Sequence, residues 1–474
     1  MKSRMKILIP CLAVLLFASC TKDYLNDKPY TSVVLQDAIK TEGDLLVAVT
    51  GMYSVLRTTD LFGRTLPVKG DIMADNTFVI TANSGRYITM NSFTSTAVGD
   101  AYALAVWQNA YIGIKYANSI IAAAPGITAT ANSKQYLGEA YAARALLYFE
   151  LARNYGHPYT AAPNDLGVPL VLTFDQNLLP KRNTVKEVYT QVIADLEQAY
   201  SLMSVYRGTS YFSKYAARAL EARVYQNMGD WANAKTTALD VVTSSGFALL
   251  PSASYVAYWG SPVAQTTTKN ETLFEVESDY TSNNGFDQIG FIYLTLGGGY
   301  GDILANSDLY AAYSATDVRK SLMSTGTRSG QAGTAYFCNK YINAASATDK
   351  DDTKVVRLAD VMLILAEAYY NTADPVNANL YLNKVATQRD PSFTGWTDAG
   401  AQILEDILVE RRKELAFEGS RLWDLVRLQR SWTKTSNQSP LVTIAVTPTN
   451  TQLILPIPTN EINANPNIVQ NPGY

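Results

Sequence analysis

The side chains that catalysis and metal binding most often use are scarce in this chain. Its 474 residues include one histidine, His157, and three cysteines, Cys11, Cys20 and Cys338. A structural zinc site needs four ligands, mostly Cys and His, so this composition excludes one. A nucleophile activated by histidine would have to use His157, which lies in a proline-flanked loop beside no partner motif. We therefore expect no catalytic residue, no metal ion and no cofactor.

Phosphate-binding motifs are absent from the sequence as well. The glycine run 297–301 lacks the lysine and the following helix of a phosphate cradle, so we interpret it as a loop. Glycosidases need only a pair of carboxylates, which 42 Asp and Glu residues could supply. No acidic residue stands out in an apolar setting that would raise its pKa. We predict a protein that is not an enzyme, with a surface glycoside hydrolase as the alternative.

Cys20 is the cysteine whose position indicates chemistry. It follows a leader with a basic start, an apolar run at 7–18 and small residues directly before the cysteine. This layout is typical of a secretory signal peptide, and the run is shorter than the roughly 20 residues of a membrane-spanning helix. The string LLFASC resembles a bacterial lipobox, in which the cysteine after the cleavage site receives acyl chains. We predict a signal peptide at residues 1–19 and lipidation of Cys20.

The composition of the mature chain argues against nucleic-acid binding and against disulfide bonds. Without residues 1–19 it carries 36 Lys and Arg against 42 Asp and Glu, a net charge of −6. A mildly acidic chain without basic clusters is a poor nucleic-acid binder, so we expect no nucleic-acid partner. With Cys11 removed and Cys20 lipidated, Cys338 has no disulfide partner. The 47% of hydrophobic residues must therefore stabilise the fold through a core.

Helical periodicity dominates the pattern along the chain. A capping box, Thr184 with Glu187, opens one helix, while Ser213 and Asp230 precede two others. Between them, Gly229 and Asp230 form a tight turn within a string that resembles a tetratricopeptide repeat. We predict helices at about 37–56, 101–124, 134–154, 185–199, 213–229, 230–246, 357–371, 375–389 and 401–417, and a short one ending at 430.

Two stretches lack that periodicity. We predict loop regions at residues 58–99 and 249–354, with one strand at 271–277. We predict extended chain at residues 20–35 and in the tail, which contains LILPIPTNEINANPNIVQNPGY. The long loop region is rich in aromatic residues, which argues against disorder and favours function.

Aromatic residues are the most plausible ligand contacts. The chain has 31 Tyr against 14 Phe, and a tyrosine offers a flat apolar face with a polar tip on which sugar rings can stack. We assign Trp107 and Trp423 to the core because they lie among helical apolar positions. The predicted ligand-binding residues lie in loop-like segments: Tyr280, Tyr293, Tyr300, Trp259 and Tyr87.

The densest charged stretch is ERRKELAFEGSRLWDLVRLQR, at 410–430. Glu418 and Arg421 lie three residues apart, as do Asp424 and Arg427. Apolar residues that belong in a core are interleaved with these charges. We therefore expect a buried structural ion network around Trp423 rather than a catalytic site.

Several segments, in order, resemble one family. These are CTKDYLNDKP, WQNAYIGIKYANSII, AARALLYFELARNYGHPY with the later GVPLV, RLADVMLILAEAYYN, ERRKELAFEGSRLWDLVR and LPIPTNEINANPNIVQNPGY. Together they resemble SusD/RagB-type lipoproteins of Bacteroidetes outer membranes over essentially the whole mature chain. The chain departs from the family pattern at 385–389, where Arg-x-Arg-Ala is usual, and residues 251–350 match only weakly.

The resemblance implies a mostly α fold, an α-superhelix of TPR-like helix pairs with long loops and few short strands. It divides the chain into the signal peptide, a helical region at 20–246 and a loop-rich ligand region with the family's C-terminal part at 247–474. It implies capture of a glycan or other oligomeric nutrient at the cell surface. The protein would cap a SusC-like TonB-dependent barrel and deliver ligand to it.

Lys22 and Asp23 resemble the export signal that directs such lipoproteins to the extracellular side of the outer membrane. Two further alternatives stay open besides the hydrolase. The protein could be a peptide-binding, RagB-like lid, or a lid that contacts the transporter and binds no ligand itself.

Overall fold

The computed structural model describes residues 38–175, 177–260, 269–435 and 443–474. The predicted signal peptide and the predicted lipidation site at Cys20 lie outside the described residues. Among the helices that are described, none is both long and apolar enough to cross a bilayer.

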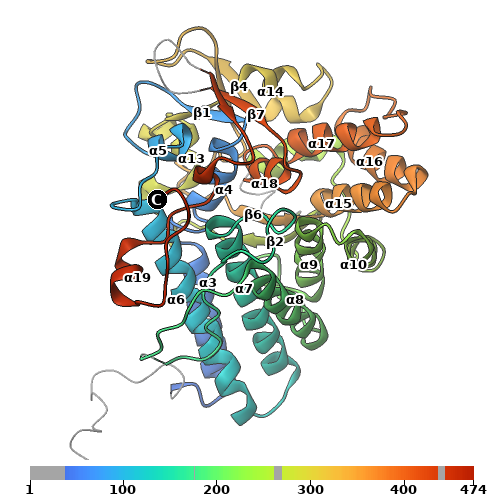
Figure 1. The fold of residues 1–474 in the computed structure, drawn as a ribbon. Coiled ribbons are helices and arrows are strands. Elements are labelled where there is room, and N and C mark those ends of the chain that lie inside the picture. Colours follow the sequence, from blue (N-terminus) through green and yellow to red (C-terminus); the bar gives the residue numbers. More distant parts are fainter. Residues whose placement is uncertain (1–37, 176, 261–268, 436–442) are drawn as a thin grey trace, which may run out of the picture.

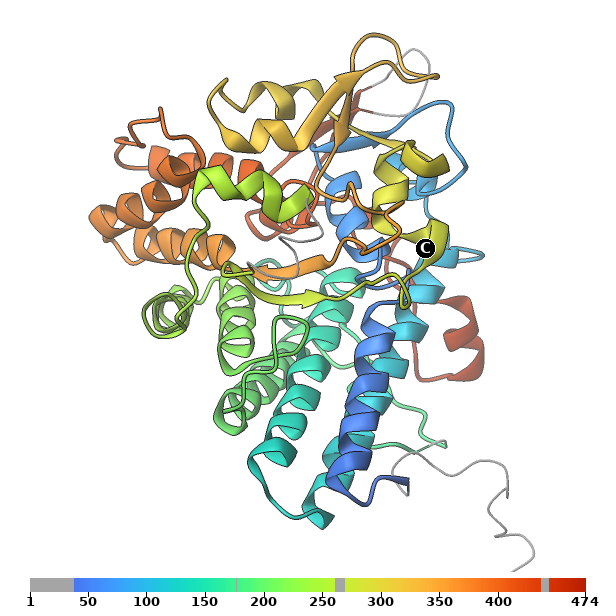
Figure 2. The same ribbon diagram turned by 180° about the vertical axis from the view of Figure 1, so that it is seen from behind.

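Most of the chain forms helices that stand side by side and curve across the molecule (Figures 1 and 2). The predicted superhelix of TPR-like pairs is confirmed, because successive helices pack as antiparallel neighbours. In chain order the long helices are α3 (Glu42–Leu56), α6 (Ala101–Ala123), α7 (Ala131–Tyr155), α8 (Val185–Leu202), α9 (Lys214–Met228), α10 (Trp231–Ser244), α15 (Leu358–Asn371), α16 (Pro375–Arg389) and α17 (Gln402–Glu414), followed by the shorter α18 (Arg421–Arg427).

Local sequence explains where several helices begin and end. The Thr184 side chain accepts from the Glu187 amide while the Glu187 side chain accepts from the Thr184 amide, which completes the predicted capping box of α8. The Ser213 and Asp230 side chains cap α9 and α10 by accepting from the amides of Ala216 and Asn233. Gly229 has φ of 73°, a left-handed conformation that glycine adopts without strain, and it turns the chain from α9 into α10.

The stretches read as loops contain short elements that periodicity could not reveal. Residues 58–99 contain α4 (Thr65–Ile72), β1 (Thr77–Val79) and α5 (Ile88–Ser92). Residues 249–354 contain α11 (Ser252–Gly260), α13 (Ile289–Tyr293), α14 (Ser307–Ala311) and most of the strands. The tail contains α19 (Thr459–Ala464), so it is not extended throughout. Single turns of 3₁₀ helix lie at Ala124–Gly126, Gly285–Asp287, Leu296–Gly298, Val318–Leu322 and Thr451–Leu453.

In the part of the chain that the structure describes, the strands form four antiparallel pairs. β1 pairs with β3 (Ile303–Ala305), and β2 (Thr272–Val276) pairs with β6 (Thr353–Arg357). The predicted strand at 271–277 is thus confirmed as β2. The other pairs join β4 (Met323–Gly326) to β5 (Ala335–Cys338) and β7 (Trp432–Thr435) to β8 (Thr443–Val446). Each short pair fixes one loop against another.

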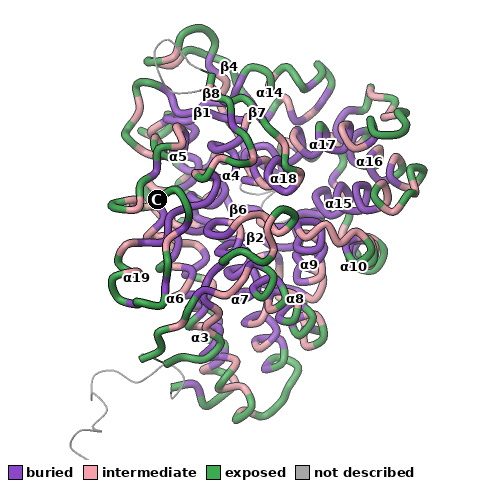
Figure 3. Tube along the Cα trace, in the orientation of Figure 1, coloured by how far each residue is buried: buried purple, intermediate pink, exposed green. Residues whose placement is uncertain are grey.

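One large core runs through the helices and the loops packed on them, and exposed residues gather at the helix ends and loop tips (Figure 3). Trp107 is buried as predicted, and Trp423 is partly buried against the same core. The core also contains charge: Glu414 accepts hydrogen bonds from Arg319, Arg357 and Arg389. These fully buried charges are satisfied by one another, as buried ions must be.

The charged stretch at 410–430 forms part of a buried ion network, as predicted, although only one of its two three-residue spacings gives an ion pair. Asp424 and Arg427 form the expected ion pair. Glu418 instead pairs with Lys340 and Arg357, and Arg421 pairs with Asp75. The three-residue spacing brings side chains together only within a continuous helix. Glu418 lies outside any helix, because α17 ends at Glu414 and α18 begins at Arg421. The turn between them contains Phe417 and Gly419 with φ of 67° and 77°, so Glu418 and Arg421 meet different partners.

Candidate functional site

Two loops distant in sequence meet at one side of the molecule, where α5 and α13 lie close together (Figure 1). The β1–β3 pairing sets Val79 opposite Ile303 and therefore holds the loop after β1 beside the loop before β3. Five side chains of these loops define what we call the loop surface: Arg86, Tyr280, Phe286, Asp287 and Tyr300.

Arg86 and Tyr300 form the fixed centre of the loop surface. The Arg86 guanidinium carbon lies 3.8 Å from the centroid of the Tyr300 ring. Arg86 Nη2 donates to the Tyr300 hydroxyl at 3.0 Å, and Nη1 donates to Ser84 Oγ at 2.9 Å. The cation and the ring attract each other through the ring's negative face, and the hydrogen bonds fix their orientation. Tyr300 is thus held in one position at the surface.

Asp287 links the loop surface to the interior. Its Oδ1 accepts from Arg64 Nη1 at 2.5 Å and lies 3.7 Å from Arg86 Nη2. Arg64 is buried, whereas the Asp287 side chain is 46% exposed. The second carboxylate oxygen of Asp287 therefore remains available to accept hydrogen bonds from a ligand.

Two exposed rings extend the loop surface on the segment after β2. Tyr280 and Phe286 are each 59% exposed, an unusual degree for large aromatic side chains. Phe286 packs against Phe291 with ring centroids 5.1 Å apart, so one of its faces is supported. A ligand that covers an exposed ring removes apolar area from water, and the free energy of binding gains the hydrophobic contribution of that area.

The turn that carries Tyr280 is fixed by its own hydrogen bonds. Asp279 Oδ1 accepts from the amides of Thr281 and Ser282, both at 2.6 Å. Burial acts to raise the pKa of Asp279, but these hydrogen bonds, together with one from the Thr281 hydroxyl, hold it below its ordinary value. Asn283 Nδ2 donates to the Tyr280 carbonyl at 2.9 Å. The ring of Tyr280 is therefore presented from an ordered turn.

Three of the five predicted ligand residues are core residues instead. Tyr87 is buried with φ of 58°, and its hydroxyl accepts from Arg64 Nε at 3.0 Å. Burial raises the pKa of the Tyr87 hydroxyl to about 12. Trp259 lies in α11, which was read as loop, and is buried beneath three cationic side chains. Tyr293 is buried and stacks on Tyr341. None of the three offers a face to a ligand in this structure.

Sequence reasoning missed Arg86, Asp287 and the support from Arg64. A signal was present in the string Gly85-Arg86-Tyr87, where a cation adjoins an aromatic residue in a polar loop. The sequence could not show that the stacked ring belongs to Tyr300, because that contact depends on the β1–β3 pairing.

The single histidine lies in a surface loop, as expected. His157 Nδ1 lies 2.9 Å from Asp165 Oδ2, and both side chains are partly open to solvent. Within the described ranges, no three His, Cys, Asp or Glu side chains gather closely enough to hold a metal ion.

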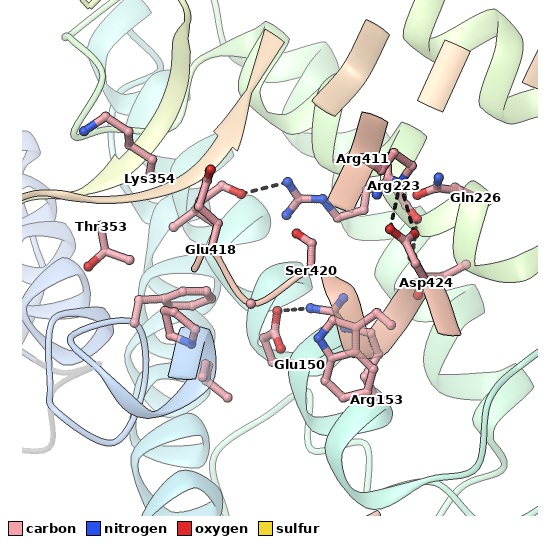
Figure 4. Close-up of a pocket in the computed structure, with 17 residues that line it drawn as sticks. Glu150, Arg153, Arg223, Gln226, Thr353, Lys354, Arg411, Glu418, Ser420 and Asp424 are labelled. Atoms are coloured by element: carbon pink, nitrogen blue, oxygen red, sulfur yellow. Dashed lines mark hydrogen bonds and ion pairs between the residues drawn. The ribbon is translucent and has the colours of Figure 1, made fainter. Parts of the chain in front are cut away.

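The pocket drawn in Figure 4 is too small for a saccharide. It measures about 40 Å³ and is lined by ion pairs, among them Glu150 with Arg153 and Asp424 with Arg411. That volume suits a few water molecules bound to polar walls. We therefore interpret it as part of the buried charge network.

Two family models together match the whole described chain. A family model described as "SusD family" matches residues 221–474, more than half of the chain. A second model, described as "Starch-binding associating with outer membrane", matches residues 23–226. The chain is 27% identical to SusD-like protein P2 of Formosa agariphila, covering 95% of this chain and 96% of that protein.

Solved structures have the same fold. A SusD superfamily protein of Bacteroides thetaiotaomicron superposes with a TM-score of 0.82 at 25% identity, covering 91% of this chain and 100% of that one. A putative sugar binding protein of Bacteroides vulgatus superposes with a TM-score of 0.82 at 27% identity, covering 92% of this chain and 99% of that one.

Proposed function

Because this chain belongs to the SusD family, we propose that it is a non-enzymatic surface lipoprotein that binds a glycan through the loop surface and delivers it to a transporter. The observation that carries the proposal is the loop surface itself. It combines a fixed Tyr300 and the exposed Asp287 carboxylate, which both meet Arg86, with two exposed rings of the same segment between β2 and β3, Tyr280 and Phe286.

The loop surface matches the chemistry of a sugar chain. One face of a pyranose ring presents C–H groups that pack against an aromatic ring, and its hydroxyls need hydrogen-bonding partners around the edge. Arg86 and Asp287 provide donors and acceptors at that edge. Small-molecule sites generally combine apolar area with a few such oriented polar groups. A peptide could use the same rings, which keeps a RagB-like ligand as the alternative.

The anchor and the partner are further parts of the proposal. Acyl chains on Cys20 would hold the protein at the outer membrane, since each buried CH₂ contributes about 0.8 kcal/mol to membrane binding. The helical half offers a broad rigid surface, built from α3, α6, α7 and α8, to a SusC-like TonB-dependent barrel. The description of the second matching family, association with the outer membrane, supports this location.

Affinity electrophoresis on a panel of polysaccharides, run beside a pull-down on immobilised peptides, tests the proposal. We expect retardation by at least one polysaccharide and co-purification of a barrel from the native membrane. Retention by peptides alone would favour the RagB-like alternative. Release of reducing sugar by the purified protein would favour the hydrolase. No retention on any ligand, with no barrel co-purifying, would contradict the proposal.

A further inference from the structure

A second groove lies away from the loop surface, at the other end of β2. It is formed by the α8–α9 connection, the first turn of α9, the chain after α10 and the residues just before β2. Its volume is about 630 Å³, within the range of roughly 300–1,000 Å³ that is typical of small-molecule sites. Tyr280 follows the C-terminal end of β2, whereas Asn270 of the groove precedes its N-terminal end.

Aromatic side chains provide the apolar part of the groove. Tyr206 is 58% exposed at the rim, and its ring meets Phe247 edge to face with centroids 6.2 Å apart. Tyr215 lines the groove from the first turn of α9. The Tyr206 ring is held from one side by Phe247 while remaining open to solvent, as a stacking platform must be.

The polar groups of the groove fall into two sets. The hydroxyls of Thr209, Ser213 and Ser245 are already bound within the protein. The Ser204 hydroxyl, the Asn270 side-chain amide and the Lys214 ammonium have no hydrogen-bond partner among the described residues. The groove therefore combines apolar ring faces with unused donors and acceptors.

The charge of the groove is set by Lys214. Its other lysine, Lys269, is neutralised by Glu275 Oε1 at 2.6 Å and Asp352 Oδ2 at 2.7 Å. The Lys214 ammonium lies 4.4 Å from the centroid of Tyr200 and 6.0 Å from that of Tyr215. No carboxylate of the described residues lies within ion-pair distance of Lys214. The groove thus has one uncompensated positive charge beside its aromatic rings.

From this combination we propose that the groove is a second binding site, which takes a short saccharide with an anionic group. A sugar ring stacks on Tyr206, its hydroxyls reach Ser204 and Asn270, and its carboxylate or sulfate meets Lys214. The groove deepens the proposed function and rests on it for the ligand class, but it uses none of the residues of the loop surface.

Calorimetric titration of the detergent-solubilised full-length protein tests this proposal. The probes are trigalacturonate for a carboxylate, a sulfated chondroitin disaccharide for a sulfate, and maltotriose as the neutral control. We expect at least one acidic probe to bind. We expect Tyr206→Ala and Lys214→Gln each to weaken that binding roughly ten-fold, a change that corresponds to about 1.4 kcal/mol.

Two variants serve as controls. Lys384→Gln removes another lysine that lies over a tyrosine ring, 4.6 Å from the centroid of Tyr381, and should leave binding unchanged. Tyr280→Ala reports on the loop surface, so any binding that this variant loses belongs to that surface and not to the groove. Added salt should weaken binding of the acidic probe to the wild type, because a Lys214 ion pair at the rim is screened.

The outcomes separate the groove from the loop surface. Binding that responds to Tyr280→Ala but to neither Tyr206→Ala nor Lys214→Gln would overturn the groove and leave the proposed function standing. Binding that responds only to the groove variants would support the groove, and the polysaccharide panel would test the loop surface separately. If maltotriose binds as tightly as the acidic probes and Lys214→Gln does not weaken its binding, the proposal that the ligand is acidic would be overturned. No binding of any probe would overturn the groove, and the polysaccharide panel would then decide the proposed function separately.

Discussion

The guanidinium of Arg86 stacks on the ring of Tyr300 at 3.8 Å and donates a 3.0 Å hydrogen bond to its hydroxyl, across 214 residues of sequence. This contact joins the loop after β1 to the loop before β3. It fixes one aromatic ring at the centre of a surface whose other rings are exposed. The geometry of the proposed glycan site therefore depends on a long-range pairing and not on either loop alone.

Removing the Arg86 side chain should weaken glycan binding without unfolding the protein. Arg86→Ala frees the Tyr300 ring and removes two donors, and an exposed cation–π contact is worth about 0.5–1 kcal/mol. We expect a roughly two- to five-fold loss of affinity in affinity electrophoresis, with the melting temperature nearly unchanged. Arg430→Ala, which removes a surface arginine paired with Glu405, is the control and should change neither quantity. Undiminished binding by Arg86→Ala would contradict this role.

Tyr293 should behave as a core residue. Tyr293→Ala leaves a cavity beneath α13, and we expect the free energy of unfolding to fall by about 3–5 kcal/mol in a denaturant titration. The Tyr293 hydroxyl has no hydrogen-bond partner among the described residues, so Tyr293→Phe should cost little or even stabilise the fold. Tyr280→Ala should change stability by less than about 0.5 kcal/mol. Equal losses from Tyr280→Ala and Tyr293→Ala would contradict the assignment.

Local signals in the sequence predicted the helices well. The capping box of α8 spans four residues, and the Gly229 turn depends only on its own neighbours, so both could be predicted directly. The sequence could not show which aromatic residues of the loops are exposed. Tyr293 is covered by Tyr341 and Phe417, and Trp259 by Lys340, Lys354 and Arg357, all from distant segments. The sequence therefore indicated Tyr280 and Tyr300 of the proposed loop surface, but it could not show that Tyr293 and Trp259 are buried.

The buried Asp360 carboxylate should make the stability of the protein sensitive to acid. Burial acts to raise the pKa of Asp360, but Arg223 and Arg411 outweigh it and hold the pKa at about 2, below the ordinary 3.8. The folded state thus binds this proton less readily than the unfolded state. Asp360 stabilises the fold above about pH 4, and its contribution of about 2 kcal/mol is lost as the pH falls towards 2.

Urea titrations between pH 5 and pH 2.5 measure this contribution. The free energy of unfolding of the wild type should fall steeply over that range, and Asp360→Asn should flatten the fall. Asp308→Asn changes an exposed partner of Arg412 and should leave the pH dependence as in the wild type. A pH dependence identical in the wild type and Asp360→Asn would show that Asp360 is not the group responsible. A wild-type stability that is constant down to pH 2.5 would contradict the account of the buried network.

Lipidation of Cys20 can be checked without a ligand. Cys20→Ala should leave unprocessed or soluble protein and abolish incorporation of labelled palmitate, because the acylated thiol is lost. Cys11→Ala, within the predicted leader, should still be processed and labelled. Membrane attachment of Cys20→Ala equal to that of the wild type would refute the lipoprotein interpretation.

The most direct test of the central claim is a calorimetric titration of the double variant Tyr280→Ala with Phe286→Ala, using whichever glycan retards the wild type most strongly. The double variant removes both exposed rings on which a sugar could stack. We therefore expect at least a ten-fold loss of affinity with an unchanged melting temperature. Wild-type affinity in the double variant would contradict the proposal that the loop surface binds the glycan.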